Sequence, residues 1–476
     1  MFKATLRTAV LLLSLCLLCS LPAVAQNWSQ VWSDEFTGPL GTPIDSTKWT
    51  YDTGILNVNN EVEYYCAPST NVGGCLTTNP NAYIDGNGNL VIQAIRLNNS
   101  TAPNSGSWTS ARLITNSLET FQYGRVESRM SLPVGPGIWP AFWSLGSNIA
   151  TVPWPNCGEQ DYMENVPLSP GGLGPTVIAS TLHGNSTSGV YNLGGKFTFA
   201  TGDVTGMHAY GAIWSPGMVQ FYVDDPTKVF FVGTSNDMKN GQTWAFDHPF
   251  FLLLNLAIGG DGSWPGPTDG TTPNPAVMTI DYVRIYKAAA VQAPTFGSAP
   301  SITVKAGATA GNSSSFSLND TSGSGRVFLT CSTTAPKTTC QVTTNDALNP
   351  NTVDFSNATS GTVSVSVLTT ANAVLWPITW HWRTPNWVAL FDALLLLGVL
   401  AALLKSLRRL RLASTAAISF VLVAILLGCS GGSSTPPPSP GNGTTPGTYT
   451  ITVNAYTVSG TGGSPDSSTT LSLTVN

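Results

Sequence analysis

The chain has 476 residues, more than one ordinary hydrophobic core accommodates, so we expect two globular units with accessory segments. Its net charge is −5, and its basic residues are scattered except for a cluster at 405–411, which argues against nucleic acid as a partner. Only 9% of the residues are charged, and abundant Gly, Pro, Ser and Thr favour strands joined by tight turns, so we expect an all-β protein.

The N-terminus has the pattern of a secretory signal peptide. A short basic start precedes an apolar run at 9–19, and Ala23-Val24-Ala25 follows a proline. The apolar run is too short to span a bilayer. Residues 1–25 are therefore expected to be removed after Ala25, and the mature chain to be exported.

Export permits disulfides, and four cysteines fall in two close pairs. Cys66 lies near Cys75 and Cys331 lies near Cys340, so each pair could staple a surface loop. Cys157 is interpreted as a small buried residue.

Residues 26–287 are predicted to form one large β-sandwich. Short segments such as 90–94, 124–132 and 279–286 alternate or run apolar, turn signals separate them, and no sustained helical period occurs.

Three carboxylates fall within six residues of this charge-poor region, in Glu159-Gln160-Asp161-Tyr162-Met163-Glu164. On a regular strand Glu159 and Asp161 share a face and Glu164 points the other way. A one-residue bulge at Tyr162 or Met163 would return Glu164 to that face. Retaining glycosidases need two carboxyls about 5 to 5.5 Å apart. A solvated acidic strand or a calcium loop is the alternative interpretation.

Four further segments follow. Residues 288–380 are rich in Ser, Thr and Val and are predicted to form a small immunoglobulin-like β unit. Residues 381–429 contain two apolar runs around a basic turn, which predicts a transmembrane helical hairpin over 387–428 with its turn in the cytoplasm. Residues 430–446 read as a Pro/Gly/Ser/Thr linker.

The chain closes with strand-like runs in 447–476, which could add to the sheet begun before the hairpin because both pieces would lie in one compartment. Cys429 ends a lipobox-like sequence, and its lipidation is left open. We expect an extracytoplasmic protein tethered to the membrane.

Several motifs occur in a characteristic order around the acidic strand. They are Trp32-Ser33-Asp34-Glu35-Phe36, Asn59-Asn60-Glu61, Gly137-Ile138-Trp139-Pro140-Ala141-Phe142-Trp143, Leu182-His183-Gly184 and Asp281-Tyr282-Val283-Arg284-Ile285-Tyr286. From Val31 to Tyr286 the sequence resembles glycoside hydrolase family 16, and within it the laminarinase-like branch with the motif Glu-x-Asp-x-x-Glu. Gln160 departs from the aliphatic residue usual there, which we expect to change packing only.

The resemblance implies a concanavalin-like jelly roll and a retaining endo-β-1,3-glucanase, or an enzyme that accepts mixed β-1,3/1,4-glucans. It assigns Glu159 as nucleophile, Asp161 as its assistant and Glu164 as general acid/base. No cofactor is implied for catalysis, and a monomer is expected.

The resemblance also implies substrate-binding residues, and aromatic rings suit sugars because they stack on a pyranose face. Matching positions are Trp139, Trp143, His183, Asn60, Glu61, Arg125 and Trp264. Glu35 and Asp281 match segments that hold structural calcium in some members, and their oxygens suit that ion.

Two alternatives stay open. A noncatalytic β-glucan-binding surface protein could use the same fold, although such relatives have lost the catalytic glutamates that this chain keeps. A hydrolase of another β-linked polysaccharide such as agar is the other, and the sequence leaves linkage preference and endo or exo action undetermined.

Overall fold

The computed structural model describes residues 27–97, 107–166, 172–290, 292–371, 443–458 and 464–476. The expected signal peptide at 1–25 and the expected hairpin at 387–428 lie outside these ranges. None of the described residues forms a helix with the length and hydropathy of a membrane span. The sole helical element of the described ranges is the 3-10 turn η1 (Ser235–Asp237), which confirms the all-β class.

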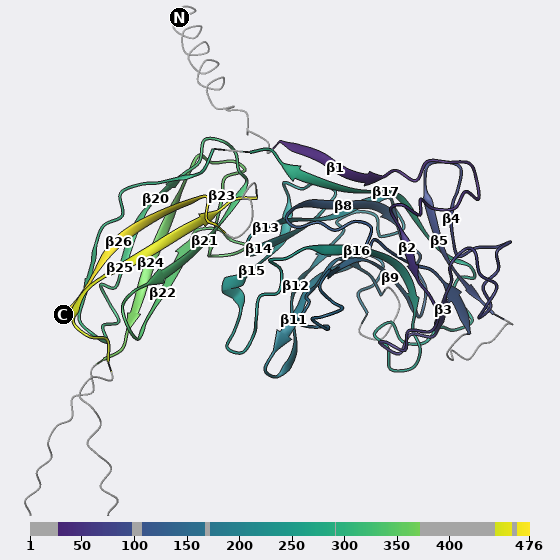
Figure 1. Ribbon diagram of the computed structural model, residues 1–476, viewed down its shortest axis with the longest axis horizontal. Coiled ribbons are helices and arrows are strands. Elements are labelled where there is room, and N and C mark those ends of the chain that lie inside the picture. Colours follow the sequence, from purple (N-terminus) through teal and green to yellow (C-terminus); the bar gives the residue numbers. More distant parts are fainter. Residues whose placement is uncertain (1–26, 98–106, 167–171, 291, 372–442, 459–463) are drawn as a thin grey trace, which may run out of the picture.

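Two sheets packed face to face form the first unit (Figure 1). The ten-stranded sheet has the order β15-β14-β13-β8-β17-β5-β6-β3, with β1 on β17 and β4 on β5. Its strands are β1 (Trp28–Asp34), β3 (Glu63–Tyr65), β4 (Ala82–Ile84), β5 (Leu90–Arg96), β6 (Trp108–Ser110), β8 (Gly124–Ser131), β13 (His208–Ser215), β14 (Met218–Val223), β15 (Val229–Thr234) and β17 (Ala276–Ala288).

The seven-stranded sheet has the order β12-β11-β10-β9-β16-β7-β2. Its strands are β2 (Thr50–Asp52), β7 (Arg112–Ile114), β9 (Ile138–Gly146), β10 (Glu159–Glu164), β11 (Val177–Ser186), β12 (Gly189–Thr198) and β16 (Phe250–Ile258).

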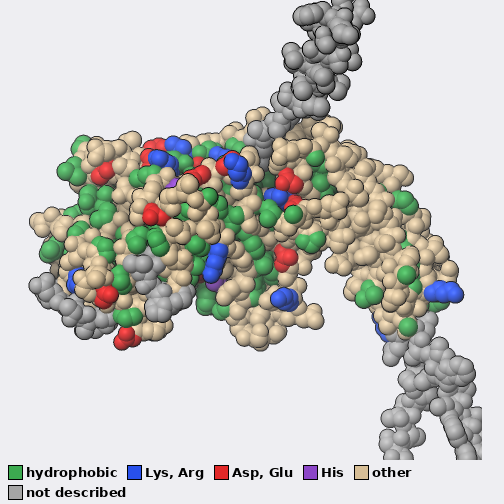
Figure 2. All heavy atoms as spheres, turned by 180° about the vertical axis from the view of Figure 1, so that it is seen from behind, with side chains coloured by type: hydrophobic (Ala, Val, Ile, Leu, Met, Phe, Trp, Pro, Cys, Tyr) green, Lys and Arg blue, Asp and Glu red, His purple; other side chains and the backbone are tan. Residues whose placement is uncertain are grey.

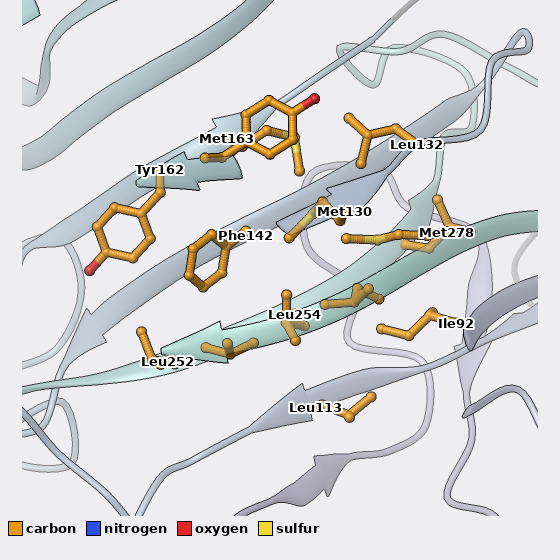
Figure 3. Packing of buried hydrophobic residues seen from close by; sticks show 14 of the residues in the cluster. Ile92, Leu113, Met130, Leu132, Phe142, Tyr162, Met163, Leu252, Leu254 and Met278 are labelled. Atoms are coloured by element: carbon orange, nitrogen blue, oxygen red, sulfur yellow. The ribbon is translucent and has the colours of Figure 1, made fainter. Parts of the chain in front are cut away.

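The core of the first unit fills the space between these sheets and follows the alternation of the strands. Phe142 on β9, Leu254 on β16 and Met130 on β8 are fully buried in one cluster (Figure 3). The neighbours of Phe142 on β9, such as Trp143, therefore point to the opposite face of the seven-stranded sheet, which we call the site face.

A second unit contains a four-stranded and a five-stranded sheet around a separate core rich in valine and leucine. The first sheet holds β18 (Thr295–Phe296), β20 (Ser313–Asn319), β22 (Thr338–Thr344) and β24 (Ser360–Thr369). The second holds β19 (Ile302–Val304), β21 (Arg326–Thr333), β23 (Thr352–Asp354), β25 (Gly447–Tyr456) and β26 (Ser467–Val475). On the face shown in Figure 2 this unit carries few charged side chains.

The C-terminal strands belong to this second unit. β25 pairs antiparallel with β21, and β26 pairs parallel with β19. Two strands alone would be marginally stable, and here they complete the five-stranded sheet. The suggestion that 447–476 joins the sheet begun before the predicted hairpin is confirmed.

The two units touch through β14, β15 and η1 of the first and β21 of the second. Phe328 packs against Met218 and Val232. Gly217 allows this approach, because a Cβ there would lie 2.5 Å from the Phe328 ring and its φ is +69°. The Asn236 side-chain amide also donates to the carbonyl oxygen of Leu329 (3.0 Å).

Both cysteine pairs are disulfide-bonded, Cys66 with Cys75 and Cys331 with Cys340. Cys157 is a free thiol that is fully buried beside Leu253, which confirms its interpretation as a small packing residue.

Candidate active site

A bulge in β10 decides where its carboxylates point. Against β9, Asp161 pairs with Trp143 and Met163 pairs with Phe142, so Tyr162 is the extra residue. Tyr162 and Met163 both lie in the core (Figure 3), whereas a regular strand would send one of them outward. The predicted bulge is therefore confirmed, and it returns Glu164 to the face of Glu159 and Asp161.

The site face carries the acidic residues next to aromatic ones. Across the strands, Asp161 is opposite Trp143, and Glu164 is opposite Ala141, two residues from Trp139. On the other side of β10, Glu159 pairs with His183 of β11. Because directly paired residues point to the same face, the sheet brings Glu159, Asp161 and Glu164 together with these predicted residues.

The environment of the three carboxyl groups disfavours their charged forms and so raises their pKa values. Burial, then the charge of Asp161, raises the pKa of Glu159 to about 8. Burial, then the charge of Glu159, raises the pKa of Glu164 to about 7. Asp161 is only 2% exposed, and burial followed by repulsion from Glu164 raises its pKa well above the usual range.

His183 is the basic group of this cluster. Its Nε2 lies 2.9 Å from Asp161 Oδ2 and 3.9 Å from Glu159 Oε1. Its Nδ1 lies 2.7 Å from the side-chain oxygen of Asn192 on β12, which fixes the ring. A positive His183 lowers the pKa of both glutamates and so offsets part of their mutual repulsion.

Two tryptophans adjoin Glu164. The Trp139 indole nitrogen donates a hydrogen bond to Glu164 Oε1 (3.0 Å). The Trp264 ring meets Trp139 edge to face, with 5.6 Å between ring centroids, and is 39% exposed. The structure thus brings the loop residue Trp264 to this end of the cluster, with a ring surface open to a ligand.

A chain of hydrogen bonds joins Trp143 to Glu61. The Trp143 indole donates to Asn255 Oδ1 (2.7 Å), the Asn255 amide donates to the Tyr65 hydroxyl (3.2 Å), and that hydroxyl donates to Glu61 Oε2 (3.1 Å). The backbone oxygen of Asn60, beside Glu61, accepts from the backbone amide of Gly260, two residues after β16 (2.9 Å). Predicted Glu61 and Asn60 therefore connect to the site face.

Sequence reasoning missed Asn255, Tyr65 and Asn192. Asn255 is the one polar residue of β16, in the segment Phe-Phe-Leu-Leu-Leu-Asn-Leu-Ala-Ile, which was a usable signal. A buried amide in an apolar strand needs partners, so it marks a polar neighbour on the same face. Nothing in the local sequence marks Tyr65 or Asn192.

Arg125 is not brought to this cluster. It lies on β8 of the ten-stranded sheet, and Val126 beside it points into the core between the sheets. By alternation Arg125 points away from the core, on the far side of the sandwich from the site face. Arg125 therefore cannot contact a substrate on the site face, and the substrate-binding role that the resemblance implied for it is wrong.

Glu35 and Asp281 do not fit the expected calcium site. Both oxygens of Glu35 accept from Arg284, at 2.9 and 2.7 Å, which lowers the pKa of this carboxyl. Asp281 is paired with Arg129 at 2.5 Å. A cation would compete with Arg284 for both oxygens of Glu35 and with Arg129 for one oxygen of Asp281, so these residues are suited to ion pairs.

The raised pKa values predict a stability that falls as pH rises. Between the ordinary value of 4.5 and the folded values of about 8 for Glu159 and about 7 for Glu164, the folded state binds more protons than the unfolded state. The free energy of unfolding therefore decreases over this range. Calorimetric melting should show that Tm falls from pH 5 to pH 8. In the double variant Glu159→Gln, Glu164→Gln the Tm should depend less on pH. If Tm fell equally in both proteins, the two glutamates would not be the cause of the pH dependence.

Comparisons with known proteins bear on the first unit. The sequence profile described as glycosyl hydrolases family 16 matches residues 74–284. A beta-glucanase of Rhodothermus marinus is 34% identical over 300 residues, which cover 60% of this chain and 96% of that protein. A glucan endo-1,3-beta-glucosidase A1 of Niallia circulans is 33% identical over 279 residues, 56% of this chain and 39% of that protein. The solved endo-beta-1,3-glucanase of Pyrococcus furiosus is 38% identical, with a TM-score of 0.47 over 56% of this chain and 96% of that chain.

Proposed function

Because the chain belongs to glycosyl hydrolase family 16 and is a glycoside hydrolase, we propose that it cleaves β-1,3- or mixed β-1,3/1,4-glucans with retention of the anomeric configuration. The names of the relatives from Rhodothermus marinus and Niallia circulans support a β-glucan substrate. The observation that carries the mechanism is the bulge at Tyr162, which leaves Glu159 and Glu164 on one face beside partly exposed aromatic rings.

In the first proposed step the Glu159 carboxylate attacks the anomeric carbon, and the bond to the leaving sugar oxygen breaks as Glu164 protonates that oxygen. In the second step Glu164 removes a proton from water, whose oxygen displaces Glu159 from the same carbon. Glu159 and Glu164 are then restored. Two inversions give net retention, and this chemistry uses carboxyls alone, so the proposal involves no cofactor.

Asp161 supports the roles of its neighbours. Burial and the charge of Glu164 raise the pKa of Asp161 well above its usual range, so Glu159 would ionise next to a neutral group. The Trp139 indole leaves one oxygen of Glu164 free to carry the proton that the leaving group takes. Trp139, Trp143 and Trp264 would stack on pyranose rings on either side of the scissile bond.

We propose that the first unit is a concanavalin-like jelly roll and the second an immunoglobulin-like module, in an exported monomer tethered to a membrane through 387–428. The contacts of Thr370 and Thr444 support the tether. Thr444 N–H donates to Thr370 O, and Thr370 N–H donates to Thr444 Oγ1, each at 2.9 Å. The described chain therefore stops and resumes at neighbouring residues of the second unit, which is compatible with an inserted hairpin.

A direct test incubates the purified chain with laminarin, lichenan and agarose. We expect reducing ends from laminarin and lichenan, none from agarose, and a first product in the β configuration when followed by proton NMR. An α-configured first product would contradict the double displacement. Binding of laminarin without any hydrolysis would favour the noncatalytic alternative.

A further inference from the structure

A pocket of about 350 Å³ lies between the two units, on the far side of the sandwich from the site face. The first unit contributes Trp28, Arg125 and Gln220, and the second contributes Arg326, Ser356 and Asn357. This volume is within the range of sites for small organic ligands. The proposed glucan hydrolysis does not use it.

Arg125 is the unusual group in this pocket. Its guanidinium carbon lies 3.9 Å from the centroid of the Tyr286 ring and 5.3 Å from that of Trp28, so two aromatic rings hold it in place. Its Nε–H is buried and has no hydrogen-bond partner among the described residues. No acidic side chain of the described ranges forms an ion pair with it.

Arg326 differs from Arg125 although both line the pocket. Its nitrogens lie 2.6 Å from Asp346 and 2.6 Å from Asp354, so two carboxylates match its charge. A third nitrogen donates to the side-chain oxygen of Gln220 (3.1 Å), which links the two units. Of the two arginines in this pocket, Arg125 is therefore the one whose positive charge is available to a ligand.

The other polar groups suit hydroxyls. The side-chain oxygen of Gln220 accepts a hydrogen bond from Arg326. The side-chain nitrogen of Gln220 makes no hydrogen bond within the described residues. Ser356 and Asn357 of the second unit also line the pocket, and the Ser356 hydroxyl and the Asn357 amide can both donate and accept. A sugar ring presents hydroxyls of this kind.

We propose that this pocket binds a monosaccharide-sized carboxylate, a uronic acid, with its carboxylate on the guanidinium of Arg125 and its hydroxyls on Gln220, Ser356 and Asn357. A guanidinium presents paired N–H donors that match a carboxylate, and the aromatic rings hold it ready for that contact. Such a ligand touches both units, so its binding also stabilises their arrangement. The site is separate from the glucan site and does not depend on the proposed hydrolysis.

Isothermal titration calorimetry of the full chain with sodium glucuronate, glucose and sodium sulfate, at constant ionic strength, tests this site. We expect saturable one-to-one binding of glucuronate, with glucose and sulfate at least tenfold weaker. Arg125→Gln should weaken glucuronate binding at least tenfold. The matched control Arg129→Gln removes an arginine of the same strand face that is paired with Asp281, and it should bind as the unchanged chain does.

Two further variants separate the site from folding and from catalysis. Asn357→Asp places a negative charge in the pocket without touching the Arg125 stack, and should also weaken glucuronate binding about tenfold. Glu159→Gln should bind glucuronate normally. Absence of saturable binding, equal affinity for sulfate, or unchanged affinity in both Arg125→Gln and Asn357→Asp would overturn the proposal.

Discussion

Replacing Glu159 with glutamine is expected to lower kcat on laminarin by on the order of 10⁴-fold or more, because the amide cannot form the glycosyl bond of the double displacement. The side chain keeps its size, and its neighbours His183 and Asp161 stay in place. Substrate affinity, and the Tm measured at pH 5, should therefore change little. The measurement is reducing-sugar release under saturating laminarin, with laminarin binding measured by calorimetry.

Two controls separate a nucleophile from a merely buried carboxylate. Glu119→Gln makes the same chemical change in the turn after β7, outside the cluster, and should keep kcat within about twofold, as surface changes usually do. Glu159→Ala should regain turnover of an activated aryl β-glucoside in sodium azide and yield the α-glycosyl azide. A β-glycosyl azide from this variant would assign the nucleophile to Glu164 instead.

Replacing Arg326 with alanine is expected to destabilise the second unit by about 3–5 kcal/mol, because it leaves buried charge without its partner. The side chains of Arg326 and Asp346 are 8% and 3% exposed, so both charges are largely removed from water. The contact with Gln220 is lost as well, which loosens the junction of the two units. Differential scanning calorimetry should show a transition of the second unit at a clearly lower temperature.

The control for this prediction is Arg129→Ala. Arg129 and Asp281 are 42% and 34% exposed, and a solvated pair of this kind contributes roughly 0–1 kcal/mol. Its melting curve should stay close to that of the unchanged chain. An equal fall in Tm in both variants would mean that the buried ion pairs of Arg326 contribute no more to stability than the exposed pair of Arg129.

The sequence by itself determined the features that depend on residues close together in the chain, namely the bulge in the acidic strand and the two disulfides. The period of two along a strand fixes which residues share a face, so the positions of Glu159, Asp161 and Glu164 required a bulge that the structure contains. A separation of nine residues brought Cys66 to Cys75 and Cys331 to Cys340, because a short loop returns its ends to each other.

Only the tertiary structure decided which strands lie together and which face each side chain meets. Alternation alone could not tell that Arg125 points away from the core on the other sheet, because both faces of a strand look alike until a sheet covers one of them. The contacts of Asn255 with Tyr65, and of Arg326 with Gln220, join residues 190 and 106 positions apart. Contacts between residues so far apart in the chain produce no recognisable pattern in the sequence around either residue, because they depend on how the whole chain folds.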